Sequence, residues 1–129
     1  MTNNSAVPIS ADGTLRRPLG LAVMLILLAL ANIFGGIFGL THRAEIFSQF
    51  PAFTPALWNV YILCPLVGIT AMAAMWYWRK WGFWLACVGA ALVFGIELYA
   101  MGFGLHLARI VIAMGLIISF MRPAWRQFR

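Results

Sequence analysis

A carboxylate and a guanidinium in apolar surroundings, Glu97 and Arg109, are the side chains of this sequence with the clearest capacity for chemistry. Glu97 lies within one apolar run, and Arg109 lies at the start of the next. Glu97 is six residues before position 103 and Arg109 six residues after it, and Gly102 and Gly104 permit a tight reversal between them. Equal offsets in an antiparallel helical hairpin place the two side chains at matching depth, so an ion pair is predicted.

Two interpretations of this pair are open from the sequence. As a structural feature, a buried Glu97–Arg109 pair would fix the register of two neighbouring helices. As a functional feature, it would belong to a polar pocket for protons, an ion or a ligand headgroup, because ionisable side chains at membrane depth usually face a bundle interior or a water-filled cavity. The candidate polar site comprises Glu97, Arg109, His106 and Asn32, with His42 and Glu45 as further candidates from a neighbouring loop.

The sequence carries none of the spacings that mark common catalytic or cofactor sites. HxxxH, HExxH and CxxCH arrangements of metal or haem ligands are absent, as are a Walker loop, a dinucleotide fingerprint and GxSxG. The sequence therefore predicts a protein that is not an enzyme, with no catalytic residues, no cofactor and no metal. A membrane enzyme or redox carrier is the alternative, and it requires His42 and His106 to converge.

Hydropathy predicts the elements that position these residues. The chain is 64% hydrophobic and 9% charged, its mean hydropathy is +0.92, and about 20 mostly apolar residues suffice for a helix to cross a bilayer. The predicted fold is an all-α polytopic membrane protein, a bundle of four transmembrane helices over residues 18–40, 56–78, 81–101 and 105–121. The last helix is long enough to cross only if Arg109 is accommodated within the bilayer.

The positions of the basic residues predict the orientation. The net charge is +6, and with four spans seven basic residues fall on one side: Arg16, Arg17, Arg79, Lys80, Arg122, Arg126 and Arg129. By the positive-inside rule, both termini are predicted to be cytoplasmic, in a bacterial inner membrane. Residues 1–15 are predicted to be a disordered cytoplasmic tail, 16–122 the membrane domain, and 123–129 a basic cytoplasmic tail. Basic residues placed in this way argue against binding to nucleic acid.

Aromatic residues surround the expected turn at the cytoplasmic side. The group comprises Trp78, Arg79, Lys80, Trp81 and Trp84. Indoles favour the headgroup level and cations favour anionic headgroups, so the bilayer itself is a predicted partner. Two roles are open for this group: anchoring of the topology, or a specific site for an anionic lipid or a partner protein.

Residues 41–55 form the one sizeable loop expected on the opposite side. Its prolines are predicted to prevent a continuous regular element, and its phenylalanines are expected to cap the bundle. Trp58 and Tyr61 are predicted to form an aromatic belt next to this loop. In the first helix, Gly35 and Gly39 have the GxxxG spacing that lets helices approach closely, which indicates either internal packing or a dimer face.

Short motifs give the sequence a family resemblance. They are RPLG at 17–20, GGIFGL at 35–40, WRKWGFW at 78–84 and FMRP at 120–123. With these motifs, roughly residues 16–126 resemble a group of small bacterial four-helix inner-membrane proteins of unknown function. The resemblance implies the fold and the location, and supplies no catalytic residues. Small multidrug exporters and small fluoride channels share the size and helix number, but the acidic residue that the exporters carry in their first helix is absent.

Two functions follow as expectations. Little chain lies outside the predicted membrane domain and no catalytic constellation is visible, which favours a non-enzymatic accessory or assembly subunit of a larger membrane complex. Such a protein would bind other membrane subunits or itself. The alternative is a small homo-oligomeric transporter or channel that uses Glu97 and Arg109 in a polar path.

Overall fold

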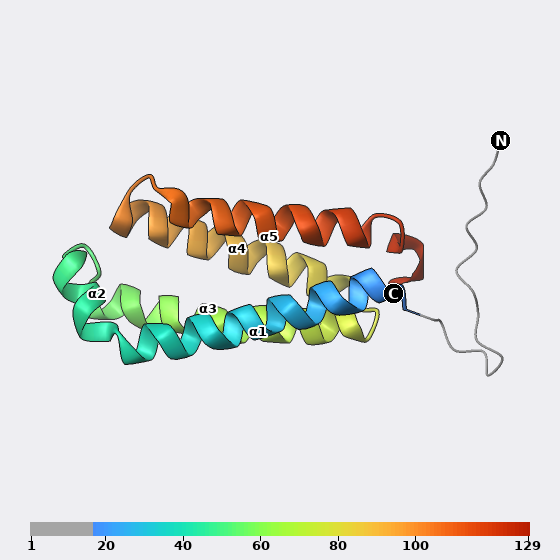
Figure 1. The fold of residues 1–129 in the computed structure, drawn as a ribbon, viewed down its shortest axis with the longest axis horizontal. Helices are drawn as coiled ribbons and strands as arrows, with labels where there is room; N and C mark the ends of the chain where they lie inside the picture. The colour runs from blue at the N-terminus through green and yellow to red at the C-terminus, as the bar shows by residue number, and fades with distance from the viewer. Residues whose placement is uncertain (1–16) are drawn as a thin grey trace.

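The computed structural model describes residues 17–129, which are helical with short connections (Figure 1). The helices are α1 (Leu19–Thr41), α2 (Arg43–Gln49), α3 (Pro55–Trp76), α4 (Lys80–Met101), α5 (Leu105–Met121) and the short 3-10 helix η1 (Trp125–Gln127). The four long helices begin and end within two residues of the predicted limits. The predicted tail over residues 1–15, and Arg16, lie outside the described residues.

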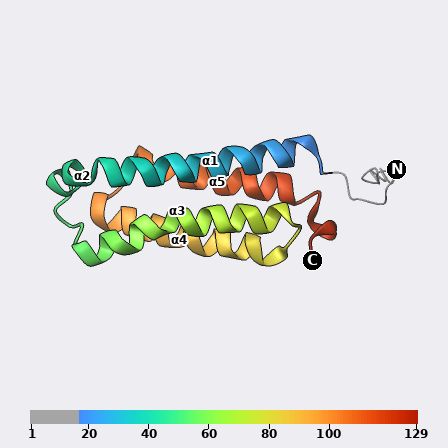
Figure 2. The ribbon, with the colours of Figure 1, turned by 90° about the horizontal axis from the view of Figure 1, so that it is seen from below.

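Three of the helices, α1, α3 and α4, are long and apolar enough to cross a membrane, which suggests a membrane protein. Helix α5 is apolar but shorter, with 17 residues. The long helices pack side by side with alternating direction, α1 and α4 each lying against both α3 and α5 (Figures 1 and 2). Helix α2 and the α4–α5 turn lie at one end of the bundle, here termed the α2 end. The α3–α4 turn and η1 lie at the other, the C-terminal end.

The limits of α3 and α4 follow from local sequence. Pro55 occupies the first position of α3, where a missing N–H is harmless, and the Thr54 hydroxyl accepts a hydrogen bond from the Leu57 amide at 3.2 Å. Helix α4 ends at Gly102, whose φ of 74° is a conformation that favours glycine. The chain can therefore reverse within three residues, 102–104, before α5 begins.

The segment 41–55 contains a short helix, α2, that was not predicted, although no continuous element spans the segment. The helix occupies the part that precedes Pro51, so neither proline interrupts it. Its phenylalanines do cap the α2 end: Phe47 and Phe53 pack edge-on against Trp58, with ring centroids 5.5 and 5.7 Å apart. Trp58 is only 1% exposed, so the prediction that it joins an aromatic belt is wrong.

Glycines set the closest helix contacts. A Cβ at Gly82 of α4 would lie 2.8 Å from the backbone oxygen of Ala71 and 2.7 Å from the Ala74 Cβ, so α3 and α4 meet there almost backbone to backbone. In α1, Gly39 faces Ile62 of α3, whereas Gly35 faces open space. The two glycines of the GxxxG spacing therefore do not act as a pair inside this chain.

The residues after α5 return across the C-terminal end of the bundle. The Lys80 amide donates to the Arg129 carbonyl at 2.8 Å, and the Arg129 amide donates to the Trp78 carbonyl at 2.7 Å. Phe128 is buried and packs edge-on against Trp78, with centroids 5.0 Å apart. The basic segment 123–129 is therefore packed against the α3–α4 turn, which its charge alone did not indicate.

Candidate functional site

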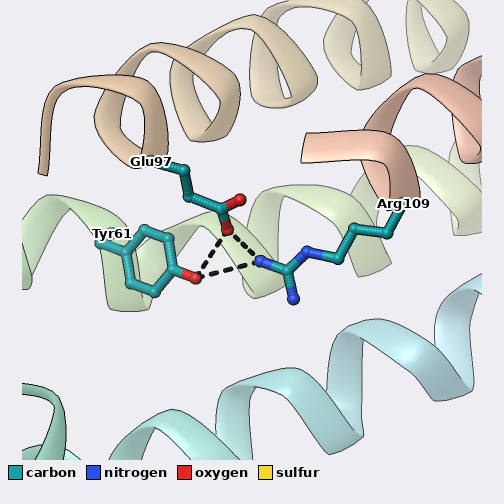
Figure 3. A network of polar contacts seen from close by, with 3 residues as sticks. All are labelled: Tyr61, Glu97 and Arg109. Atoms are coloured by element: carbon teal, nitrogen blue, oxygen red, sulfur yellow. Dashed lines mark hydrogen bonds and ion pairs between the residues drawn. The ribbon is translucent and has the colours of Figure 1, made fainter. Parts of the chain in front are cut away.

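A fully buried glutamate lies at the centre of the candidate site. Glu97 is on α4, four residues before its end, and its side chain is 0% exposed among helices that are otherwise apolar. The carboxylate points toward α3 and α5 (Figure 3). Such a group requires partners, because an isolated charge in an apolar interior is strongly unfavourable.

Two side chains from neighbouring helices supply these partners. The Arg109 guanidinium on α5 forms an ion pair with the Oε1 atom of Glu97 through its Nη2 atom. The Tyr61 hydroxyl on α3 donates to the same oxygen at 2.9 Å, and it accepts a hydrogen bond from Arg109 Nη2 at 3.3 Å. The three groups close a triangle that ties α3, α4 and α5 together (Figure 3).

Glu97 and Arg109 each leave part of their hydrogen-bonding capacity unused within the described residues. Glu97 Oε2 is buried and has no hydrogen-bond partner among residues 17–129. The Arg109 side chain is 59% exposed, and only its Nη2 atom donates within this part of the chain. The arrangement therefore neutralises Glu97 while leaving most of the Arg109 side chain exposed.

The other residues of the predicted polar site do not join the triad. His106 is half-buried one turn before Arg109, and its buried Nε2 has no hydrogen-bond partner among the described residues. Asn32 instead donates to the Leu28 carbonyl of its own helix at 2.8 Å and packs against Gly68 of α3. Of the four residues predicted to form one polar cluster, only Glu97 and Arg109 contact each other.

The two candidates from the loop, His42 and Glu45, also make contacts only with residues close to them in the sequence, in the described part of the chain. The His42 ring stacks on Phe38 with centroids 4.2 Å apart, and Glu45 accepts a hydrogen bond from Gln49 at 3.3 Å. Neither side chain has a hydrogen bond or ion pair to the triad within residues 17–129. In that range no three His, Cys, Asp or Glu residues gather as ligands for a metal.

Tyr61 is the site residue that the sequence analysis assigned wrongly, to an aromatic belt. A signal was present: Tyr61 is six residues after the first residue of α3, Glu97 four before the last of α4, and Arg109 four after the first of α5. At 1.5 Å per residue, these positions differ in depth by only about 3 Å. Tyr99, two residues after Glu97, is 74% exposed and makes no hydrogen bond to the triad among the described residues.

The aromatic and basic group at the C-terminal end has mixed exposure. Trp81 and Trp84 are exposed on α4, whereas Trp78 is half-buried behind Phe128. Arg79 and Lys80, in the same turn, are exposed. Trp78 also has a φ of 59°, an uncommon value for a residue with a side chain.

Arg17, which precedes α1, is a further basic residue at the C-terminal end of the bundle. Its guanidinium stacks 3.8 Å from the centroid of the Trp76 ring and donates to the Trp76 carbonyl. Burial lowers the pKa of Arg17 from its ordinary value, because desolvation disfavours the charged form. The indole face compensates through a cation–π contact, so one basic residue anchors α1 to the end of α3.

Two surface hollows of the described chain lie at the C-terminal end and not beside the triad. One is lined by Thr70, Ala73, Ala74, Tyr77, Arg79 and Trp81. The other lies between α4 and α5 and is lined by Phe83, Trp84, Ile118, Met121, Arg122 and Trp125. Each combines apolar helix surface with indole and a single arginine.

Comparison with known proteins gives no relative: no protein-family model, no curated protein and no solved structure matches this chain. The function is therefore argued from the geometry of the chain itself.

Proposed function

We propose that this protein is a four-span protein of a bacterial cytoplasmic membrane with both termini in the cytoplasm. Helix α5 is about 25 Å long at 1.5 Å per residue, which is close to the thickness of a hydrocarbon core. Its one charged residue, Arg109, is paired with Glu97. The basic residues at the C-terminal end outnumber those at the α2 end, which supports a cytoplasmic C-terminal end.

A reporter experiment tests this arrangement. Alkaline phosphatase, which is active only outside the cytoplasm, is expected to be inactive when joined by a flexible linker after Arg129. The same reporter inserted in the segment between Gln49 and Pro55 is expected to be active. Activity after Arg129 would mean that α5 does not cross the membrane or that the orientation is reversed.

The function we propose is that of a non-enzymatic accessory or assembly subunit of a larger membrane complex. The observation that carries this proposal is the Arg109 side chain, which is 59% exposed and donates only through its Nη2 atom among the described residues. Lipid chains provide no acceptor for its remaining donors, and the partner we propose for them is a polar group from another subunit. The triad itself holds α3, α4 and α5 together, since the charges of Glu97 and Arg109 neutralise each other.

Purification from the native membrane tests the function. The tagged chain is expected to retain a stoichiometric foreign membrane protein, identified by mass spectrometry of the intact assembly. Arg109→Lys keeps a positive charge for Glu97 but lacks the second edge of a guanidinium, so the yield of the partner should fall severalfold. Arg43→Lys, also an exposed arginine at the α2 end, is the matched control and should leave the yield unchanged.

The second candidate is a small homo-oligomeric transporter or channel, favoured by the buried, unpartnered Oε2 atom of Glu97. A chain that purifies only with copies of itself would favour this alternative and contradict the accessory role. In liposomes, proton-coupled flux would then depend on pH and be lost in Glu97→Gln.

A further inference from the structure

The groove between α4 and α5 at the C-terminal end has the composition of a lipid site. Its floor is Met121, 1% exposed, and its walls include Phe83 and Trp125, whose rings pack edge-on with centroids 5.3 Å apart. Trp84 and Ile118 border it with exposed side chains. The groove is therefore apolar along the helices and aromatic where the helices end.

The single charge that lines the groove has no acidic partner among the residues that the structure describes. Arg122 follows the last residue of α5 and is exposed, and within residues 17–129 its side chain makes no hydrogen bond or ion pair. The acidic residues of this range are Glu45 and Glu97, on α2 and near the end of α4. Both belong to the opposite end of the bundle, so no acidic side chain of the described residues lies near the cations at this end.

The order of groups along the groove matches that of a phospholipid. Ile118 lies one turn deeper in α5 than Arg122, and the indoles of Trp84 and Trp125 lie in the groove lining with it. Indoles favour the headgroup level of a bilayer and guanidinium groups bind phosphate through paired donors. An acyl chain along Ile118 would place a phosphate beside Arg122.

We propose that this groove binds one anionic phospholipid, with the phosphate at Arg122 and an acyl chain between α4 and α5. The site needs only that these helices lie in a membrane, so it is independent of the accessory function proposed above. It is a defined site and not the diffuse attraction that any basic surface exerts on anionic headgroups.

Native mass spectrometry of the full chain, released from nanodiscs, tests the proposal. In bilayers that mix phosphatidylglycerol and phosphatidylcholine, the wild-type chain is expected to retain one phosphatidylglycerol in preference to phosphatidylcholine. Arg122→Gln should lower that retention about fivefold, which corresponds to the upper end of the contribution of one direct, exposed ion pair. Arg126→Gln removes an equal charge from the same end, at an exposed residue that does not line the groove, and should change retention less than twofold.

A second variant tests the apolar part independently of charge. Ile118→Trp should fill the groove and displace the lipid while Arg122 is kept. Equal losses in Arg122→Gln and Arg126→Gln would overturn the proposal, since diffuse electrostatics would then explain the binding. Full retention in Ile118→Trp, equal retention of the two lipids, or occupation of the groove by an acidic protein segment would also overturn it. Size-exclusion profiles like the wild type's establish that each variant is folded.

Discussion

Replacing Arg109 with methionine is expected to lower the free energy of unfolding by about 3 kcal/mol, the lower end of the range for breaking a buried ion pair. Glu97 is 0% exposed, so the substitution leaves its carboxylate without a countercharge. The lower end applies because the Arg109 side chain is itself 59% exposed and loses less hydration when paired. Reversible unfolding in detergent, followed by circular dichroism, measures the change.

The double variant Glu97→Met/Arg109→Met separates the penalty of an unpaired charge from the value of the pair. It is expected to recover most of the lost stability, because both charges are then gone from the interior. A double variant no more stable than Arg109→Met would contradict the structural role of the pair. Tyr61→Phe removes one hydrogen bond to Glu97 and keeps the ion pair, so it should cost only about 1 kcal/mol.

Gly82→Ala is expected to destabilise the bundle by about 2–3 kcal/mol, near the upper end of the range for overpacking. The added Cβ would lie 2.8 Å from both the Ala71 carbonyl oxygen and the Met75 amide nitrogen, and backbone atoms cannot move aside as a flexible side chain can. Helices α3 and α4 would have to separate where they pack most closely. The same unfolding measurement in detergent applies.

Gly95→Ala is the matched control for Gly82→Ala. It lies on the same helix, α4, but no atom outside the local backbone lies within 4 Å of its added Cβ. Alanine at this position should be neutral or stabilise by up to about 1 kcal/mol, through its higher helix propensity. If both variants destabilise equally, helix packing is not what requires Gly82.

The positions of the long helices were predictable because hydropathy and proline mark their ends directly. The matching depth of Glu97 and Arg109 followed from counting residues outward from the turn between α4 and α5. The rotation of each helix was not predictable, since nearly every position is apolar and no polar face marks the interior. This is why Tyr61 and Trp58 were both placed in a belt, whereas one contacts Glu97 and the other is buried.

The packing at the C-terminal end was also not predictable from the sequence. Residues 123–129 were predicted only as a basic cytoplasmic tail, and their charges did not reveal that Phe128 and Trp125 pack against residues of the α3–α4 turn and of α4. Their contacts are distant in sequence, and no periodicity over a few residues reveals them. Helix α2 was missed for a different reason, since Pro51 and Pro55 restrict only the residues near them and leave Arg43–Gln49 free to form a helix.

During synthesis, α4 leaves the ribosome before α5, and Glu97 is made before the arginine that neutralises it. The connection between the two helices is only three residues, 102–104, so in the proposed four-span arrangement they would enter the bilayer together as a hairpin with the charges already matched. A chain that stalls before Arg109 would carry a lone carboxylate among lipid tails, which is unfavourable. The neutralisation of Glu97 therefore depends on the synthesis of α5 at least as far as Arg109.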